Sequence, residues 1–175
     1  MEHDHTGLYV LISIQVGLVR VKTRSGKRFM FLERKNMKVF LGGTCNDSKW
    51  RDEIKPLLAN DGLEYFDPIV DDWDEKAQAQ ELEEREKCDI CLYVLTPKMT
   101  GTYSIAEVVD DSNKRPEKTV LVVLPEDEES KFDEFQMKSL NQVSKMVKGN
   151  GGKAFKDLVS AINWMSKINK LMETK

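Results

Sequence analysis

The chain has 175 residues, of which 40% are hydrophobic and 33% are charged, and its formal net charge is -3. This length and composition favour one globular domain with a real core. Acidic and basic residues are mixed and no basic block occurs, so we expect no nucleic-acid polymer as a partner. The longest apolar stretch, 8–19, is too short for a membrane span of ~20 residues and lacks the features of a signal peptide. We therefore expect a cytoplasmic protein with no membrane partner.

Cysteine and histidine are scarce in this chain. Cys88 and Cys91 have the spacing of a metal or redox pair. However, Cys91 falls in a predicted strand, where residues three apart point to opposite faces. No second cysteine pair occurs, and the odd number of cysteines fits a reducing compartment. We expect these thiols to belong to the core and predict no metal site.

Residues 1–36 differ from the rest of the chain. Alternating apolar residues in 9–21, a turn at 24–27 and a returning segment at 28–32 predict a β-hairpin. We expect this hairpin to be an appendage to a domain formed by 37–175. An open alternative is that Met37 is the true start of the protein, because the regular pattern begins there.

From Met37 onward, strand patterns alternate with helix patterns. Asn46, Asp47 and Ser48 are candidate N-caps of the first helix. The predicted strands are 38–41, 63–66, 90–95 and 119–124. The first predicted helix ends at Asn60, and the other four span 74–87, 104–112, 132–148 and 155–171.

This alternation predicts an α/β fold with a doubly wound parallel sheet of about four to five strands. Right-handed crossovers leave few topologies, and we expect a flavodoxin-like, Rossmann-like order of 2-1-3-4. The loops that follow the strands then meet at the carboxyl edge of the sheet, where open α/β sheets bind ligands.

The loop after the first strand of this domain carries Gly42, Gly43 and Thr44. Glycine lets a ligand approach the backbone, and the next helix N-terminus favours an anionic group. A tight strand-to-helix turn explains the motif equally well. It lacks the P-loop lysine and the full dinucleotide fingerprint, so we predict no cofactor.

The loop after the 90–95 strand leads into a helix that carries Glu107. A carboxylate at that edge is a candidate catalytic group. The alternative is structural: Ser104 and Glu107 have the spacing of a capping box, in which the glutamate binds the N-cap amide. Other candidates for ligand binding at the same edge are Asp67, Asp72, Trp73, Gly101, Tyr103 and Ser104.

Three blocks together resemble the nucleoside 2-deoxyribosyltransferase-like family, most closely its branch found in bacterial and phage genomes. The blocks are FLGGTCNDSKWR (40–51), YFDPIVDDW (65–73) and CDICLYVLTPKMTGTYSIAEVVDDS (88–112). The resemblance covers roughly 37–167. Three blocks in order and with matching spacing are more specific than any one of them.

The resemblance implies N-glycosidic chemistry on nucleosides or nucleotides. In this family a glutamate at the start of the helix after the third strand attacks the anomeric carbon, and Glu107 matches that position. An acid on the preceding helix contacts the sugar; Glu81 is the nearest match and Glu84 the alternative. Acidic residues nearby help to protonate the leaving base, and we include Asp89 among the catalytic candidates, with a plain strand-start role as its alternative.

The family also implies oligomers in which a neighbouring subunit helps to close the site. The last helix favours a homo-oligomer too, because its apolar residues exceed one amphipathic stripe. These residues are Leu158, Ile162, Trp164, Met165 and Ile168. Family members with transfer activity often have a tyrosine where this chain has Phe40, and an aspartate where it has Gly101.

Two other functions stay open at this point. The segment 96–107 is loosely similar to TIR-like NAD glycohydrolases, which also place a glutamate after a central strand, but 40–44 and 65–73 fit them poorly. A non-catalytic nucleotide sensor would keep the fold without turnover, and Phe40 in place of tyrosine favours it.

Overall fold

The computed structural model describes residues 13–15, 18–23, 26–31, 36–45, 47–72 and 74–173. The chain divides into two compact units. One comprises Met1–Lys35 with Lys167–Lys175, and the other is Asn36–Ser166. In the first unit, β1 (Ser13–Gln15), β2 (Leu18–Thr23) and β3 (Gly26–Phe31) form a three-stranded antiparallel sheet. β2 and β3 pair as a hairpin, but the predicted first arm, 9–21, is not one strand, because β1 within it pairs with β2.

The second unit contains a five-stranded parallel sheet in the order β10-β7-β6-β4-β5. Taken along the chain, this is the flavodoxin-like order 2-1-3-4 with a fifth strand added at the β7 edge, so the predicted fold class is confirmed. The strands are β4 (Lys38–Gly43), β5 (Glu64–Phe66), β6 (Ile90–Leu95), β7 (Thr119–Val123) and β10 (Lys153–Phe155).

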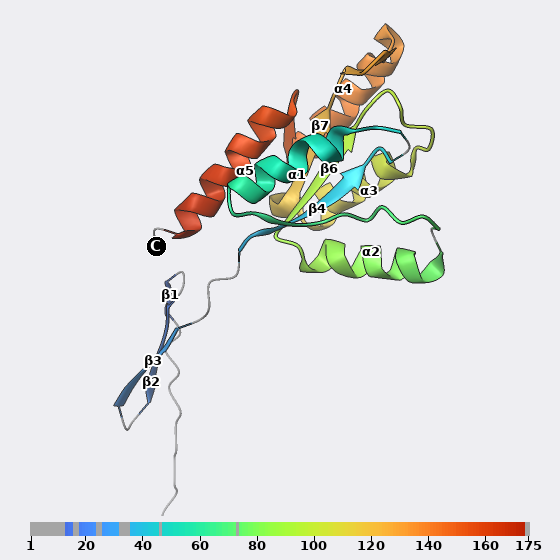
Figure 1. The fold of residues 1–175 in the computed structure, drawn as a ribbon. Helices are drawn as coiled ribbons and strands as arrows, with labels where there is room; N and C mark the ends of the chain where they lie inside the picture. Colours follow the sequence, from blue (N-terminus) through green and yellow to red (C-terminus); the bar gives the residue numbers. More distant parts are fainter. Residues whose placement is uncertain are drawn as a thin grey trace, which may run out of the picture. The chain divides into compact units, whose positions relative to one another are not determined.

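The order in which the chain adds strands changes side at β4. The chain first places β5 on one side of β4 and then places β6 on the other side. Helices lie on both faces of the sheet, with α1 and α5 on one face and α2, α3 and α4 on the other (Figure 1). The helices are α1 (Trp50–Asn60), α2 (Glu75–Lys87), α3 (Tyr103–Lys114), α4 (Glu134–Gly149) and α5 (Leu158–Glu173). A 3-10 turn (η1, Pro116–Lys118) precedes β7, and a two-stranded ribbon of β8 (Glu126–Asp127) and β9 (Ser130–Lys131) follows it.

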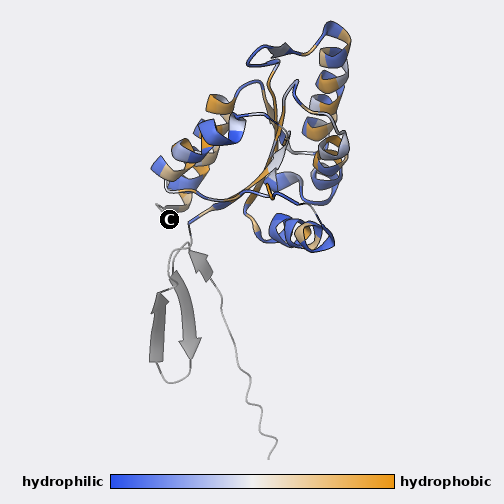
Figure 2. Cartoon of the chain, turned by 45° about the vertical axis from the view of Figure 1, so that its right-hand side comes forward, coloured by the Kyte–Doolittle hydropathy of each residue, from blue (hydrophilic) through white to orange (hydrophobic). Residues whose placement is uncertain are grey.

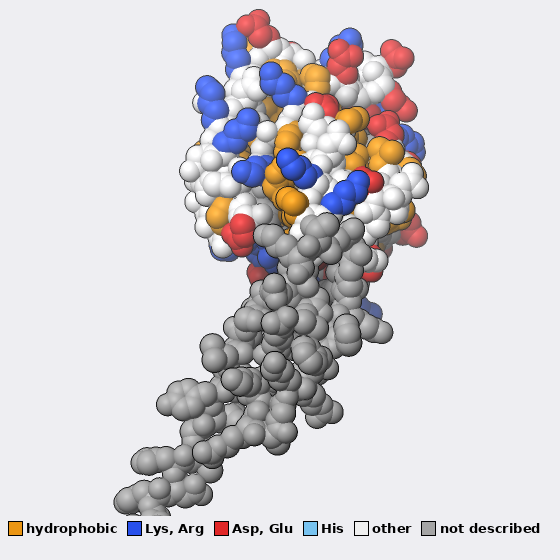
Figure 3. Space-filling view, turned by 90° about the vertical axis from the view of Figure 1, so that its left-hand side faces the viewer, with side chains coloured by type: hydrophobic (Ala, Val, Ile, Leu, Met, Phe, Trp, Pro, Cys, Tyr) orange, Lys and Arg blue, Asp and Glu red, His pale blue; other side chains and the backbone are white. Residues whose placement is uncertain are grey.

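The hydrophobic core lies along β6 and β7, all of whose residues are buried. Alternate side chains of these strands pack on Val108 of α3 and on Leu140 and Val147 of α4. Figure 2 shows this contrast between apolar strands and helices with hydrophilic outer faces. On the face seen in Figure 3, basic side chains predominate over the centre and acidic ones gather toward the right edge.

Helix α2 departs from the usual amphipathic pattern. Arg85 is its one buried residue, and the rest of its sequence is rich in glutamate and glutamine. Its N-cap is Asp74, which accepts a hydrogen bond from the Ala77 amide over 2.7 Å. An apolar stripe therefore does not hold this helix against the sheet, and a polar contact must do so.

Two local predictions were wrong. Residues 153–155 form the edge strand β10 and not the start of a helix, because the main-chain groups of Ala154 and its neighbours pair with β7. The last helix begins only at Leu158, after Asp157, whose carboxylate accepts a hydrogen bond from the Ser160 amide over 2.7 Å. A strand of three residues is too short for its periodicity to be recognised.

The N-cap of α1 was also predicted wrongly. The N-cap residue is Lys49, and no side chain caps the helix. The hydroxyl group of Ser48 donates instead to Asp127. Asn46 lies outside the described residues.

The last helix uses much of its apolar surface within its own domain. Leu158, Ile162 and Met165 are buried, and the ring of Trp164 packs on Phe155 at 6.0 Å between centroids. These residues leave less apolar surface for a second subunit than the sequence suggested. Among the described residues, no helix is both long and apolar enough to cross a membrane.

Candidate active site

Glu107 lies more than one turn into α3, which begins at Tyr103. The N-cap of α3 is Thr102, and no side chain caps the helix, so the capping-box alternative for Ser104 and Glu107 is wrong. Glu107 is 6% exposed, and its Oε1 accepts a hydrogen bond from Nη1 of Arg85 over 2.9 Å. No described residue donates to Oε2. One carboxylate oxygen is thus held and the other has no hydrogen-bond donor.

Arg85 binds a second carboxylate, that of Asp111, which lies one helical turn after Glu107 on α3. Its Nη2 donates to Asp111 Oδ1 over 2.7 Å, and the hydroxyl of Tyr93 donates to Asp111 Oδ2 over 2.5 Å. Arg115 Nε also lies 3.0 Å from Asp111 Oδ1. This buried cluster of Arg85, Glu107, Asp111, Tyr93 and Arg115 connects α2, α3 and β6, and it explains how a polar helix such as α2 is held to the domain.

The electrostatics of this cluster favour a proton on Glu107. Burial raises the pKa of Glu107 to about 7, Arg85 opposes that change, and the nearby carboxylates Glu81 and Asp111 add to it. Arg85 cannot fully compensate Glu107 because it also serves Asp111. Burial works against the charge of Arg85, but its hydrogen bond to Asp111 and the surrounding negative groups raise its pKa overall.

The residues at the carboxyl end of β4 are closely packed against β6. The ring of Phe40 is fully buried between Phe66 and Tyr93, each 6.1 Å away between centroids. A Cβ on Gly42 would lie 2.8 Å from the rings of Phe40 and Tyr93. A Cβ on Gly43 would lie 2.1 Å from the carbonyl oxygen of Val94 on β6. Gly43 also has φ +110°, in the region that favours glycine. Packing against β6 therefore accounts for both glycines.

Thr44 and Asp67 are held in hydrogen bonds and ion pairs within the domain. The hydroxyl oxygen of Thr44 accepts from the Thr96 amide over 2.9 Å, which joins the loops after β4 and β6. The Asp67 carboxylate pairs with Arg51 at 3.3 Å and with Lys55 at 2.6 Å. These contacts place both residues at the carboxyl edge of the sheet but commit their polar groups to its structure.

Glu81 and Glu84, one turn apart on α2, have different surroundings. Glu81 is half-buried one turn before Arg85, and its charge raises the pKa values of both Glu107 and Cys45. Glu84 instead binds Lys38 Nζ at 2.5 Å, at the amino end of β4. Of the two candidates for a sugar-binding acid, the structure brings Glu81 close to Glu107.

Asp89 is not brought to the site. It precedes β6, and its carboxylate accepts a hydrogen bond from the Lys38 amide over 2.8 Å. Glu107 instead lies on α3, which follows the carboxyl end of β6. Asp89 therefore has the strand-start position that was its alternative role.

The remaining described candidates lie on the loops at the carboxyl edge or in the first turn of α3. Tyr103 is 56% exposed, and a Cβ on Gly101 would meet no atom within 4 Å, so both border open space. Asp72 is exposed and Ser104 is half-exposed. Trp73 lies outside the described residues.

The sequence reasoning missed Arg85, Asp111 and Arg115. A signal for two of them exists, because Glu107, Asp111 and Arg115 are spaced by four and therefore lie on one face of α3. Arg85 had no such signal, since it is one of many charged residues on α2.

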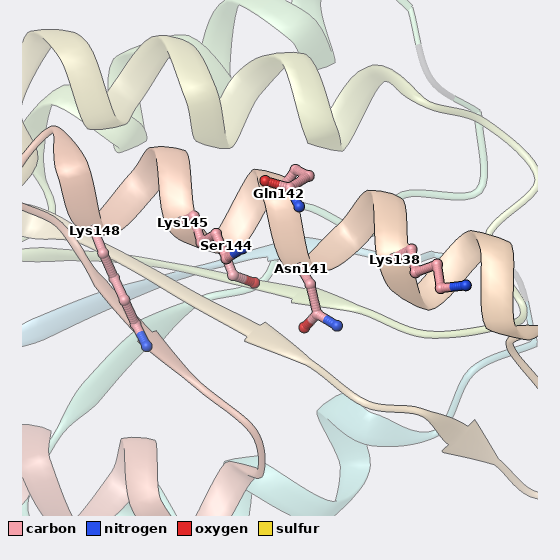
Figure 4. Close-up of a pocket in the computed structure, with 6 residues that line it drawn as sticks. All are labelled: Lys138, Asn141, Gln142, Ser144, Lys145 and Lys148. Carbon is pink, nitrogen blue, oxygen red and sulfur yellow. The ribbon is translucent and has the colours of Figure 1, made fainter.

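The described residues contain no group of three or more potential ligands positioned to hold a metal ion. Cys88 and Cys91 are core residues, and burial raises their pKa values to about 11 and about 12. Two hollows, of ≈ 420 and ≈ 270 Å³, lie along α4 and the ends of β7 and β10, and Glu107 lines neither of them. Figure 4 shows the residues that line the larger one.

Comparison with known proteins identifies the family. A search of curated proteins finds no significant match. A family model described as "Nucleoside 2-deoxyribosyltransferase like" matches residues 36–128, which is more than half of the chain. The match runs from just before β4 through β8 and includes Arg85, Glu107 and Asp111. The family suggests glycosyl transfer on nucleosides and implies a nucleoside as the substrate. The chain belongs to the nucleoside 2-deoxyribosyltransferase like family.

Proposed function

We propose that the protein cleaves or transfers the N-glycosidic bond of nucleosides or nucleotides, with Glu107 as the nucleophile. The observation that carries this proposal is the state of the Glu107 side chain. Arg85 holds Oε1 at 2.9 Å, no described residue donates to Oε2, and α3, which carries Glu107, follows the carboxyl end of the central strand β6. A fixed carboxylate with one unbound oxygen is suited to attack a carbon centre.

The proposed reaction has two displacement steps. Glu107 Oε2 attacks the anomeric carbon of the sugar, and the bond from that carbon to the base nitrogen breaks with its electron pair going to the base. An acid protonates the departing base. Water or the nitrogen of a second base then attacks the same carbon, which releases the product and regenerates the Glu107 carboxylate. Both steps pass through an oxocarbenium-like state, which the negative charge of a nearby carboxylate stabilises.

The surrounding residues support distinct roles. Glu81 lies one turn from Arg85 on α2 and is proposed to bind the sugar hydroxyls. Gly101, Tyr103 and Ser104 border the entrance to α3 and are proposed to contact the nucleoside, with Tyr103 stacking on the base. Asp72 is an exposed carboxylate on the loop before α2 and is a better candidate than Asp89 for protonating the base, because Asp89 lies at the other end of β6.

Ligand roles for Phe40, Gly42, Gly43, Thr44 and Asp67 are less well supported. Their side chains or Cα positions are already engaged in packing, hydrogen bonds or ion pairs. We propose that these residues shape the floor of the site. Trp73, which lies outside the described residues, and a neighbouring subunit of a homo-oligomer are proposed to contribute to the site.

A second candidate function, nucleotide binding without turnover, is favoured by Phe40. Phenylalanine has no hydroxyl group, and active relatives often have a tyrosine at this position. The Phe40 ring is also fully buried between two aromatic rings. The hydroxyl of the adjacent Tyr93 does not replace it, because it donates to the buried Asp111.

One assay separates these candidates. The protein is incubated with a panel of deoxynucleosides, their 5′-monophosphates and NAD, and free base is measured by chromatography. Release of a nucleobase with and without a second base distinguishes transfer from hydrolysis, and release of nicotinamide from NAD would support the glycohydrolase alternative. If no compound is cleaved while one of them raises the melting temperature, binding without turnover replaces the proposed reaction.

A further inference from the structure

A hollow of ≈ 270 Å³ opens where β7 and β10 end, beside α4. Its apolar lining includes Val123 and Phe155, the last residues of β7 and β10, together with Met137 of α4. Its polar lining consists of Asn141, Ser144, Lys148 and Lys156. The hollow therefore lies at the carboxyl edge of the sheet, the edge at which open α/β sheets bind ligands.

A second hollow, of ≈ 420 Å³, continues along α4 and shares Asn141, Ser144 and Lys148 with the first. Figure 4 shows that these three side chains point from α4 toward the strands, whereas Gln142 points to the other side of the helix. Lys138, Gln142 and Lys145 line the second hollow as well. The two hollows thus form one groove that is bordered by the three shared side chains of α4.

Of the lysines that line this groove, Lys138 pairs with Glu134 at 2.6 Å. The others are not neutralised in this way by any described residue. Among the described residues, no carboxylate lies within 4.0 Å of Lys145, Lys148 or Lys156, whereas Lys114 pairs with Asp110 at 2.8 Å. Asp157 follows Lys156 in sequence, but its carboxylate accepts hydrogen bonds from Ser160 at the start of α5. A chain with a net charge of -3 therefore presents a local positive site at this edge.

We propose that this groove is a second ligand site, which binds a small organic phosphate. The phosphate is held by Lys148, Lys156 and the amide group of Asn141, and the organic part lies against Met137 and Phe155. Lysine ammonium groups bind phosphate as point charges, and side-chain amides add hydrogen bonds. The smaller hollow is just below the ≈ 300–1,000 Å³ of typical ligand sites, which fits a single ring with one phosphate.

This site does not depend on the proposed nucleoside chemistry. Glu107 faces Arg85 of α2, and the residues that line the groove come from α4 and the ends of β7 and β10. The two sites share no residue, so either can be present without the other.

Phenyl phosphate is a suitable probe, because it has no sugar and cannot be a substrate for N-glycosidic cleavage. Its binding is followed by the backbone amide shifts of the isotope-labelled full chain at low salt, with inorganic phosphate and phenol as comparison ligands. We expect phenyl phosphate to shift amides within 137–156 and to bind more tightly than inorganic phosphate. Phenol alone should bind least, because most of the affinity comes from charge.

Two paired variants test the residues. Lys148→Gln with Lys156→Gln should weaken phenyl phosphate binding by about tenfold or more, which corresponds to ~1.4 kcal/mol. Lys114→Gln with Lys131→Gln removes the same charge elsewhere and should leave binding unchanged, as should Glu107→Gln. Equal weakening by both lysine pairs, shifts spread evenly over all surface lysines, or no shift at about 10 mM probe would overturn the proposal. So would binding of inorganic phosphate as tight as that of phenyl phosphate, since the apolar floor would then contribute nothing.

Discussion

The guanidinium of Arg85 and the carboxylate of Glu107 form a buried ion pair, 2.9 Å between Nη1 and Oε1, that joins α2 to α3. The same guanidinium binds Asp111 at 2.7 Å. One positive group thus holds two carboxylates, of which the first is the proposed nucleophile and the second is fully buried. The stability of α2 and the ionisation of Glu107 therefore depend on the same residue.

Replacing Glu107 with glutamine tests the nucleophile directly. Glutamine has nearly the same shape and can still accept a hydrogen bond from Arg85, but it cannot form the covalent sugar intermediate. We expect Glu107→Gln to lower base release on the order of 10³-fold or more, with a far-ultraviolet circular dichroism spectrum like that of the wild type.

The matched control is Glu83→Gln, on the exposed side of α2, where the carboxylate binds Lys87. It removes the same charge from the neighbouring helix and should leave base release unchanged. Wild-type base release by Glu107→Gln, from whichever substrate proves active, would show that another residue is the nucleophile.

Loss of Arg85 should detach α2. In Arg85→Met, the carboxylates of Glu107 and Asp111 stay buried without their shared partner, which we expect to lower the free energy of unfolding by roughly 3–5 kcal/mol. Arg85→Lys keeps the charge but cannot bind both carboxylates with a planar fork, so its effect should be intermediate. Urea unfolding measures the stability, and amide hydrogen exchange of 75–87 measures the local opening.

Lys87→Met is the control for this prediction. Lys87 is on the same helix but pairs with Glu83 at the surface, so its loss should leave stability and exchange almost unchanged. If Arg85→Met is as stable as Lys87→Met, the buried cluster does not hold α2.

The sequence predicted the sheet well because buried parallel strands are marked by continuous apolar runs. β6 and β7 are such runs, and the strand order followed from the alternation of strands and helices. The edge strand β10 has three half-buried or exposed residues and no apolar run, so only its hydrogen bonds to β7 reveal it.

The site was predicted less completely than the sheet, because side-chain partners depend on three-dimensional packing. The position of Glu107 after β6 could be read from the strand and the loop, but its contact with Arg85 joins residues from two helices. Asp89 was included because the family resemblance implies acidic residues near the leaving base, but it precedes β6 and its carboxylate binds the Lys38 amide. The packing of Gly42 and Gly43 against β6 required the strand pairing.

Two glycines at the carboxyl edge should respond differently to alanine. Gly43 has φ +110°, and an added Cβ would lie 2.1 Å from the Val94 carbonyl oxygen, so Gly43→Ala should cost ~2 kcal/mol or more. Gly101 has open space around its Cα, so Gly101→Ala should leave the urea midpoint nearly unchanged. Equal midpoints for the two variants would contradict the close approach of β4 to β6. A change in ligand affinity with Gly101→Ala alone would support its place at the site.

The N-terminal segment should be dispensable for folding of the α/β domain. The family match begins at residue 36, and the unit Asn36–Ser166 has its own five-stranded sheet and core. We expect a protein that begins at Met37 to unfold cooperatively with a melting temperature close to that of the full chain. Scanning calorimetry of both proteins measures this. An insoluble or non-cooperatively melting short form would show that 1–36 belong to the core.

The pH dependence of activity follows from the pKa of Glu107. Burial raises that pKa to about 7, and only the ionised carboxylate can attack the sugar. We expect kcat/KM to rise with pH and to level off above about 7. A profile that is flat between pH 5 and 8 would mean that Glu107 is already ionised in the free protein or does not take part.

The same pKa has the opposite effect on stability. Below the ordinary pKa of 4.5, Glu107 is protonated in both the folded and the unfolded chain. Between 4.5 and about 7 the unfolded chain releases this proton while the folded chain keeps it, so stability falls as pH rises, in total by about 3 kcal/mol for the whole interval. Glu107→Gln has no proton to lose at this position. Urea unfolding of both proteins at pH 5 and pH 8 should therefore give a difference in free energy that shifts in favour of the variant at pH 8. A difference that stays constant would mean that Arg85 outweighs burial and holds Glu107 ionised throughout. A difference that shifts toward the wild type would reverse the sign of the pKa change itself.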